Sequence, residues 1–472
     1  MLQVLQADQA AYRYPQSNRG LQSFSLLVHA AEQVLITGPS GCGKSTLARC
    51  LTGLIPHLYR GNLDGQVWVE GQRTVDLSLW QLAERVGTVF QNPAAQMLAE
   101  SVEEEIVFGL ENLGLARDEI GARLEETLTR FGLQEMRWRS PQTLSGGEQQ
   151  KLALASIIAR RPRILVLDEP LSMLDSTAAI ELVAYLNELV RSGTSVVVCE
   201  HREEYFEDIP NLRTHRLHGP AVDGQTVPQL RTAPVGPQAA ELEVSDLAVT
   251  LGGRTILSDL SFSAGMGQIL AIVGRNGVGK TTLLRALAGL QAHAGSVAIN
   301  GSRPDLGLVF QNPDLQLFNP SVREEVLYRL SEPDMKLYEW LMRALGLDRY
   351  QDVPPLLLSE GEKKRVALAT VLMRKPRHGI LLDEPSLGQD VVHKAQLVGV
   401  ARALAEAGQI VILTTHDLAL VTHADRLLLL GPDGFVAQGT PGDVLDDEAA
   451  WRQLGLRVPE WITQQSTWEK RP

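Results

Sequence analysis

The sequence predicts an α/β protein made of two similar domains in tandem, each with a mostly parallel sheet covered by helices. Three observations support this prediction. Short apolar β-rich runs, such as Gln33–Thr37 and Ser195–Cys199, alternate with helical patterns, which favours a parallel, covered sheet. A glycine-rich loop that follows a β-rich run and opens a helix occurs twice, at 38–46 and 274–282. Finally, 472 residues are too many for a single hydrophobic core.

Five motifs occur twice in the same chain order. A single glycine-rich loop can arise by chance, but five motifs repeated in order indicate a duplicated nucleotide-handling unit. The pairs are Lys44 and Lys280 in the glycine-rich loops, Gln91 and Gln311, Ser145 and Ser359, Asp168-Glu169 and Asp383-Glu384, and His201 and His416.

A segment rich in proline and glycine separates the two sets of motifs. We predict a first domain at 1–218, a linker at 219–240 and a second domain at 241–472, because proline and glycine interrupt regular structure. Helical subdomains are expected at about 92–150 and about 312–365. A flexible linker of this length has an r.m.s. span of about 25 Å, which allows the two domains to pair within one chain.

Composition excludes several classes of protein. The net charge of −12 argues against a nucleic-acid surface, which needs a concentrated basic footprint. The apolar runs are far shorter than the roughly 20 residues that span a bilayer, and the N-terminus lacks a signal pattern. Cys42, Cys50 and Cys199 have no metal-type spacing, which suits a reducing compartment. Any membrane role is therefore expected to be peripheral.

The two glycine-rich loops predict phosphate binding. Glycine lets backbone N–H groups approach phosphate oxygens, and the helix N-terminus that follows favours anions. Lys44 and Lys280 are expected to reach the β- and γ-phosphates of ATP, and Ser45 and Thr281 to ligate Mg²⁺. The remaining predicted ATP contacts in these loops are Gly38, Ser40, Gly41, Cys42, Gly43, Thr46, Gly274, Asn276, Gly277, Val278, Gly279 and Thr282.

An acidic pair closes an apolar run in each domain and predicts hydrolysis. Asp168 and Asp383 stand at the carboxyl ends of predicted strands, where a carboxylate can hold the metal. The adjacent Glu169 and Glu384 are candidates for the general base that polarises the attacking water. We therefore expect an ATPase.

Beyond the phosphate loops, Leu144-Ser145-Gly146-Gly147-Glu148 and Leu358-Ser359-Glu360-Gly361-Glu362 resemble the signature loop of ATP-binding cassette (ABC) ATPases. The resemblance covers almost the whole chain. It implies an antiparallel β part and a helical subdomain beside each parallel sheet. It also implies a head-to-tail pair of domains, in which each ATP lies between one phosphate loop and the opposite signature. Ser145, Gly146, Gly147, Ser359 and Gly361 are then ATP contacts.

The same resemblance implies roles for residues outside these loops. Gln91 and Gln311 are similar to the glutamines that ligate the metal and sense a membrane partner. His201 and His416 resemble switch histidines that contact the γ-phosphate. The resemblance further implies inter-site coupling by Asp175 and Asp390 and adenine stacking on Tyr14.

Two departures from the family pattern predict unequal sites. Leu251 occupies the place of the second adenine-stacking aromatic, and Glu360 replaces a signature glycine. Head-to-tail pairing would give each site one of these departures. Because stacking on an aromatic is worth ~1–3 kcal/mol, we expect weaker adenine affinity at the Lys280 site, with both sites active.

Cys42 lies at a helix N-terminus beside Lys44, an environment that lowers a thiol pKa. We therefore expect a reactive thiol whose alkylation blocks ATP binding. An inert small residue tolerated by the loop remains the equal alternative.

The segments after the glutamines refine the resemblance. Phe90-Gln91-Asn92-Pro93 and Phe310-Gln311-Asn312-Pro313, each followed by an acidic helix, are similar to ATPase subunits of energy-coupling-factor (ECF) importers for vitamins, vitamin precursors and metals. This implies a transmembrane coupling subunit and a substrate-binding membrane subunit as partners, at the cytoplasmic face of the cell (inner) membrane. The acidic runs Glu103–Glu105 and Glu324–Glu325 are expected either to meet basic coupling helices or to form a solvated face.

Two alternatives stay open. One is the fused ATPase of a conventional sugar or peptide importer. The other is a soluble ABC protein that acts on ribosomes, although such proteins resemble this chain less because their linkers are long, charged and helical.

Overall fold

The computed structural model describes residues 2–15, 20–39, 41–218, 240–458 and 462. The chain divides into two compact units, Met1–Ala221 and Val222–Pro472, which are described separately. The predicted linker at 219–240 lies outside the described residues except for Ala240, whose carbonyl accepts a hydrogen bond from the amide of Met266 at 3.1 Å. Within the described residues, no helix combines the length and apolar character needed to cross a bilayer.

Unit 1 contains an antiparallel and a parallel sheet. The antiparallel sheet has the strand order β2-β1-β4-β5, and the parallel sheet has the order β6-β7-β8-β3-β9. The strands are β1 Gln3–Arg13, β2 Gly20–His29, β3 Gln33–Thr37, β4 Asn62–Val69, β5 Gln72–Arg73, β6 Val86–Val89, β7 Ile164–Asp168, β8 Ser195–Cys199 and β9 Arg213–Arg216.

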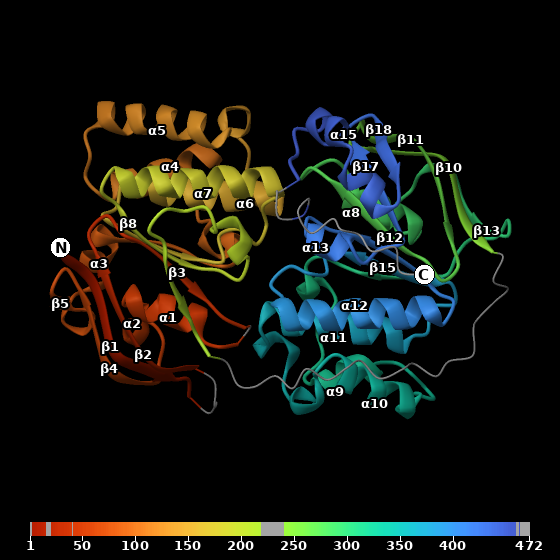
Figure 1. The fold of residues 1–472 in the computed structure, drawn as a ribbon, viewed down its shortest axis with the longest axis horizontal. Helices are drawn as coiled ribbons and strands as arrows, with labels where there is room; N and C mark the ends of the chain where they lie inside the picture. The colour runs from red at the N-terminus through yellow and green to blue at the C-terminus, as the bar shows by residue number, and fades with distance from the viewer. Residues whose placement is uncertain (1, 16–19, 40, 219–239, 459–461, 463–472) are drawn as a thin grey trace. The chain divides into compact units, whose positions relative to one another are not determined.

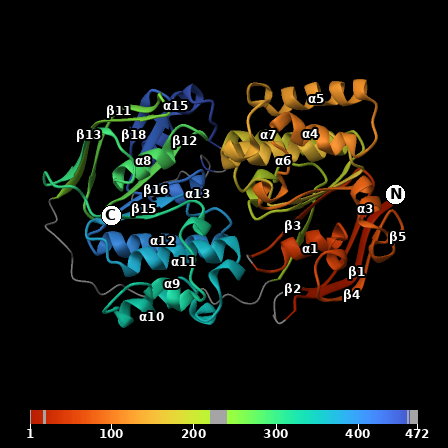
Figure 2. The same cartoon turned by 180° about the vertical axis from the view of Figure 1, so that it is seen from behind.

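The central strands of this parallel sheet are apolar along their whole length because both faces are covered. Val34 and Ile36 pack with the antiparallel sheet and α1, whereas Leu35, between them, packs with α6 and α7. Figures 1 and 2 show α4–α7 together on one side of unit 1. The helices are α1 Lys44–Leu51, α2 Leu54–His57, α3 Leu79–Arg85, α4 Val102–Glu111, α5 Arg117–Phe131, α6 Gly146–Ile158 and α7 Ser176–Arg191.

Unit 2 repeats this plan with one more strand in its main sheet. The antiparallel sheet has the order β11-β10-β13, and the main sheet has the order β14-β15-β16-β12-β17-β18, with only β18 antiparallel. The strands are β10 Glu241–Leu251, β11 Arg254–Gly265, β12 Ile269–Gly274, β13 Ala294–Ile299, β14 Leu306–Val309, β15 Gly379–Asp383, β16 Ile410–Thr414, β17 Arg426–Gly431 and β18 Gly434–Gly439.

The helices of unit 2 differ in length from those of unit 1. The helix after the second glutamine, α9, has 6 residues against 10 in α4, and α10 has 10 against 15 in α5. These differences agree with the sequence, in which Ser359 follows Lys280 by 79 positions whereas Ser145 follows Lys44 by 101. The helices are α8 Lys280–Leu287, α9 Val322–Leu327, α10 Met335–Ala344, α11 Glu360–Met373, α12 Val391–Glu406, α13 Leu418–Val421, α14 Pro441–Leu445 and α15 Glu448–Gln453.

Both units therefore confirm the predicted α/β class. In each, a parallel sheet places the ends of its strands beside the helix that the glycine-rich loop opens, and a helical part lies next to it. Carboxyl ends of parallel strands meet at one edge of a sheet, where open α/β sheets bind their ligands.

Candidate functional site

Each glycine-rich loop leads from a buried strand into a helix, β3 into α1 and β12 into α8. Gly43 and Gly279 precede these helices with φ of 103° and 106°, a left-handed conformation that favours glycine. A Cβ on Gly43 would also lie 2.8 Å from the carbonyl oxygen of Gly20. The loop therefore needs glycine at this position.

The two loop lysines are buried and folded back over their own loops. Lys44 Nζ donates to the carbonyl oxygen of Gly38 at 2.7 Å, and Lys280 Nζ donates to that of Gly274 at 2.8 Å. Each ammonium group is thus positioned over the loop that would surround a phosphate. Among the predicted loop contacts, Ser40 lies outside the described residues. Gly274 is the last residue of strand β12, and the others occupy the turns between strand and helix or the first turn of the helix.

Asp168 and Asp383 end strands β7 and β15 beside these helices. Thr281 Oγ1 donates to Asp383 Oδ2 at 2.7 Å. Burial raises the pKa of Asp168 to about 6, although a hydrogen bond from Ser45 lowers it. Hydroxyl and carboxylate are therefore adjacent in both units, as the predicted Mg²⁺ ligands require.

These residues fit a magnesium ion that is held partly by phosphate. Asp168 Oδ1 is buried and has no hydrogen-bond partner among the described residues, so an oxygen ligand is left for a hard cation. The described part of the chain has no group of three or more His, Cys, Asp or Glu side chains that could hold a metal. Mg²⁺ usually takes only one or two carboxylates, together with substrate phosphates and water.

The adjacent glutamates are almost fully buried, and their backbones have φ of 50° at Glu169 and 47° at Glu384. Burial raises the pKa of Glu169 to about 8, with Asp168 adding to the shift and Lys44 opposing it. Burial likewise raises the pKa of Glu384 to about 7, with Lys280 opposing it. Carboxyl groups with pKa values near neutrality can exchange protons at physiological pH, as a general base must.

The glutamate of unit 1 is held by the glutamine that follows β6. Gln91 Nε2 donates to Glu169 Oε2 at 2.7 Å, and His201 Nδ1 lies 4.0 Å from Glu169 Oε1. The structure therefore brings Gln91, Glu169 and His201 together, as the sequence predicted for one site.

The glutamate of unit 2 has different neighbours. His416 Nε2 lies 3.0 Å from Glu384 Oε1, and Lys280 Nζ lies 3.1 Å from His416 Nε2. Gln311 follows β14 as Gln91 follows β6. In this unit the structure groups lysine, histidine and glutamate.

Tyr14 lies against the helix of the first phosphate loop. Its hydroxyl accepts a hydrogen bond from Arg49 Nη1 at 2.7 Å and is 3.4 Å from Thr46 Oγ1. These contacts hold the Tyr14 ring beside the loop. Leu251 ends β10 in unit 2 and is 40% exposed, so that strand end offers an aliphatic surface instead.

Each signature serine caps a helix. Ser145 and Glu148 form a capping box at the start of α6, and Ser359 and Glu362 form one at the start of α11. Gly146, Gly147 and Gly361 lie in the first turns of these helices, and Glu360 is the first residue of α11. Helix N-termini favour anions, which agrees with the predicted role in phosphate binding.

Asp175 and Asp390 cap the helices that follow the glutamates. Asp175 accepts a hydrogen bond from the amide of Ala178 at 2.9 Å, and Asp390 accepts one from that of His393 at 2.9 Å. Both aspartates thus have a structural task in starting α7 and α12, in addition to the coupling role that was predicted.

The structure supports the inert alternative for Cys42. The thiol is only 5% exposed, and burial raises its pKa, outweighing the opposing charge of Lys44. Desolvation of the thiolate therefore exceeds the stabilisation expected from the helix N-terminus and the lysine.

One glutamate of each acidic run is buried against its own loop, whereas Glu104 and Glu324 are exposed. Glu105 accepts hydrogen bonds from the amides of Leu98 and Ala99, at 2.8 and 2.9 Å, and is buried. Glu325 likewise accepts two amide hydrogen bonds from the preceding loop, at 2.7 Å each. These carboxylates brace the loops before α4 and α9, which the sequence analysis missed.

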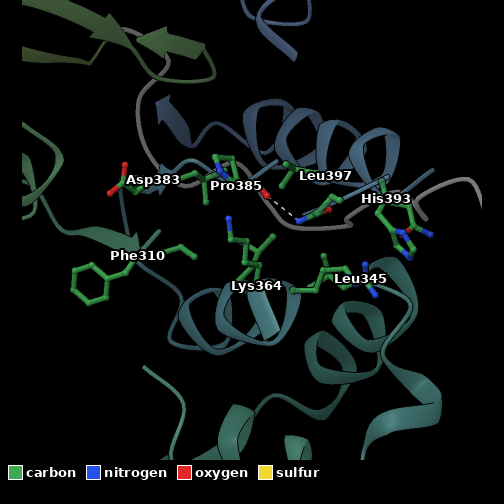
Figure 3. Close-up of a pocket in the computed structure, with 13 residues that line it drawn as sticks. Phe310, Leu345, Lys364, Asp383, Pro385, His393 and Leu397 are labelled. Carbon is green, nitrogen blue, oxygen red and sulfur yellow. Dashed lines mark hydrogen bonds between the residues drawn. The ribbon is translucent and has the colours of Figure 1, made fainter. Parts of the chain in front are cut away.

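A pocket in unit 2 is lined by Asp383 and Pro385, the two chain neighbours of Glu384, and by Lys364 (Figure 3). Lys364 reaches into it from α11 and donates to the backbone carbonyl of Glu384 at 2.9 Å. Burial lowers the pKa of Lys364 to about 8, against the opposing effect of Glu360 and Glu384. The hydrogen bond of Lys364 thus ties α11 to the loop that contains Glu384 in the same unit.

Comparison with known proteins defines the class. The family model described as ABC transporter matches residues 21–172 and 257–387. An ABC transporter ATP-binding protein of Treponema denticola, so named provisionally, is 36% identical over 458 residues, covering 89% of this chain and 93% of the relative. The chain therefore belongs to the ABC transporter ATPase family, and it is an ATPase with two such domains.

A second relative carries a more specific provisional name. The HMP/thiamine import ATP-binding protein YkoD of Bacillus subtilis is 31% identical over 533 residues, covering 98% of this chain and 97% of the relative.

Two solved structures share the fold alone. A chain of the model of ribosome-bound archaeal Pelota and ABCE1 has a TM-score of 0.69 at 20% identity, covering 93% of this chain and 80% of its own. The RNase-L inhibitor has a TM-score of 0.62 at 21% identity, covering 89% and 88%.

Proposed function

We propose that the chain is the ATP-hydrolysing energy-coupling subunit of an importer of ECF type, which takes up a vitamin, a vitamin precursor or a metal ion. The name of the Bacillus subtilis relative supports this, because it concerns import and the similarity covers nearly the whole of both chains. The glutamine-loop motifs support the ECF type. A separate transmembrane coupling subunit and a substrate-binding subunit would complete the system.

In the mechanism that we propose, each type of side chain at the site has its own role. Lys44 and Lys280 bind the β- and γ-phosphates, and Glu169 and Glu384 accept a proton from the attacking water. His201 and His416 contact the γ-phosphate. Ser45, Gln91, Asp168 and their counterparts Thr281, Gln311 and Asp383 would hold Mg²⁺, which supplies charge neutralisation at the phosphates.

The transport proposal needs the two domains to pair head-to-tail. Each ATP would then lie between one phosphate loop and the opposite signature, and Asp175 and Asp390 would couple the two sites. Only a higher affinity of the closed pair for ATP can make binding drive closure. Hydrolysis would then reopen the pair.

Exposed apolar side chains near both glutamine loops support a membrane protein as the partner. Leu98 is 75% exposed and Phe108 is 49% exposed on unit 1, and Phe318 is 64% exposed on unit 2. The rings of Phe318 and Tyr328 lie edge to face at 5.0 Å. Large exposed apolar patches mark protein–protein or membrane interaction sites, and we propose that these side chains contribute to such a patch.

Purification from membranes in detergent tests the proposal. We expect the tagged chain to retain a transmembrane protein, and the double variant Leu98→Asp/Phe318→Asp to lose it. Trp80→Asp is the matched control, because Trp80 is 64% exposed on α3, outside the glutamine loops. Retention of ribosomes, or retention of the membrane protein by the double variant, would contradict the proposal.

A further inference from the structure

Glu200 is a buried carboxylate directly before the proposed switch histidine of unit 1. Its side chain is 0% exposed, and its Oε1 lies 3.1 Å from His201 Nδ1. The same oxygen accepts hydrogen bonds from the amides of His201 and Arg202, at 2.8 and 3.2 Å. Burial acts to raise the pKa of Glu200, but His201, Arg202 and these amides outweigh it and lower the pKa. The carboxylate is therefore ionised in the folded chain.

The same carboxylate reaches the loop that follows Glu169. Glu200 Oε2 accepts a hydrogen bond from the amide of Leu171 at 3.1 Å. Arg202 Nη1 donates to the carbonyl oxygens of Leu171 and Leu174, at 2.9 and 3.3 Å. Glu200 and Arg202 thus tie the His201 segment to the loop between Glu169 and Asp175.

Unit 2 lacks this carboxylate at the matching position. Thr415 stands there, and its hydroxyl lies 3.3 Å from Ser386 Oγ and accepts a hydrogen bond from the amide of Asp417 at 3.0 Å. A pair of neutral hydroxyls is a weaker link than a charge-assisted hydrogen bond. The two histidines are therefore supported differently within one chain.

We propose that Glu200 is a positioning residue that keeps the proton of the His201 ring on Nδ1, so that contact with the γ-phosphate falls to Nε2, and that joins this histidine to the Leu171–Leu174 loop. A carboxylate behind a functional histidine fixes its tautomer and ring orientation. The proposal rests on the proposed role of His201 at the γ-phosphate. Under this proposal a carboxylate holds His201 in unit 1, whereas His416 in unit 2 follows the neutral Thr415.

Kinetics of the full chain test this in the Glu384→Gln background, where hydrolysis reports the Glu169 site. We expect Glu200→Gln to lower kcat about ten-fold, the low end of the effect of losing such a supporting group, with KM changed less than about two-fold. Combining Glu200→Gln with His201→Ala should cost no more than His201→Ala alone, because Glu200 acts through the histidine. Glu203→Gln is the control: its side chain pairs with Arg216 at the surface.

The outcomes separate the two proposals. A loss with His201→Ala but none with Glu200→Gln, or additive losses in the double variant, overturns the role of Glu200 alone. Full activity of His201→Ala overturns the role of the histidine as well.

A measurement on the unsubstituted chain covers the case in which the Glu200 variant does not fold. Selective ¹⁵N-histidine NMR, with the His201 signal assigned from a His201→Gln variant, should show a proton on Nδ1. An Nδ1 without a proton would overturn the proposal.

Discussion

Glu169 and Glu384 show how burial shifts the pKa of a carboxyl group towards neutrality. Each follows a buried aspartate at the end of a strand and has its carboxyl group inside the unit, where desolvation favours the protonated form. Lys44 and Lys280 offset part of this effect. Arriving ATP and metal would change the charge around both glutamates, so each pKa responds to occupancy of its site.

The raised pKa of Glu169 predicts a pH-dependent cost to stability in the metal-free chain. Because the pKa is about 8 in the folded chain against about 4.3 in unfolded chains, the native state holds more protons between these values. Stability is therefore lost as pH rises through this window. We expect Glu169→Gln to stabilise the chain in EDTA by a few kcal/mol more at pH 8.5 than at pH 5.5, as measured by urea unfolding. An equal gain in the free energy of unfolding at both pH values would contradict this. The same pH-dependent gain in the control Glu207→Gln, whose glutamate is exposed, would contradict it as well.

Cys42 yields the second prediction at this scale. A buried thiol with a raised pKa has little thiolate, and the thiolate is the reactive form. We expect iodoacetamide at pH 7.5 to leave Cys42 unmodified in the native chain while it modifies all three cysteines in urea, as read by mass spectrometry. Rapid native labelling of Cys42 that ATP prevents would restore the original expectation.

Helix α4 and the loop before it depend on one carboxylate. Glu105 accepts two amide hydrogen bonds from Leu98 and Ala99, and removing it leaves two donors unsatisfied. We expect Glu105→Ala to speed hydrogen exchange of the 97–101 segment at least ten-fold, which corresponds to about 1.4 kcal/mol or more of lost local stability. Glu104→Ala is the control, because Glu104 is exposed on the same helix. Equal exchange in both variants would contradict this bracing role.

The sequence predicted those elements whose pattern is local. Gln33–Thr37 and Ser195–Cys199 were expected as strands and are β3 and β8, because unbroken apolar runs of this length suit a sheet covered on both faces. The task of Glu105 could not be predicted in this way. An acidic run on a helix has the same pattern whether a carboxylate faces solvent, a partner or the amides of a loop. Glu200 is a similar case, because only the folded chain brings the Leu171 amide to it.

At the scale of the whole molecule, the two units are related but unequal. Unit 1 has Tyr14 beside its phosphate loop, Glu200 behind its histidine and a glycine-rich signature. Unit 2 has Leu251, Thr415 and Glu360 at the matching places. Head-to-tail pairing would combine the phosphate loop of one unit with the signature of the other. Neither site would then take both its phosphate loop and its signature from unit 1.

Two matched pairs of substitutions test this pairing. Under head-to-tail pairing, Lys280 and Ser145 serve one site, whereas Lys44 and Ser359 serve the other. In a Glu169→Gln/Glu384→Gln background, which should retain bound ATP, we expect Lys280→Ala/Ser145→Arg to trap about one ATP per chain, since both lesions fall on one site. Lys280→Ala/Ser359→Arg should trap almost none, since each site then carries a lesion.

The two double variants carry the same number and kind of changes, and both serines cap a helix through a capping box. The cost of losing a cap, about 1 kcal/mol, is therefore similar in the two and cannot produce the expected difference. If each unit instead used its own signature, the result would reverse, and only the Ser359→Arg pair would keep one ATP. Measuring trapped nucleotide per chain thus decides between shared and autonomous sites, and with them whether ATP can act as the clamp between the two units that an importer requires.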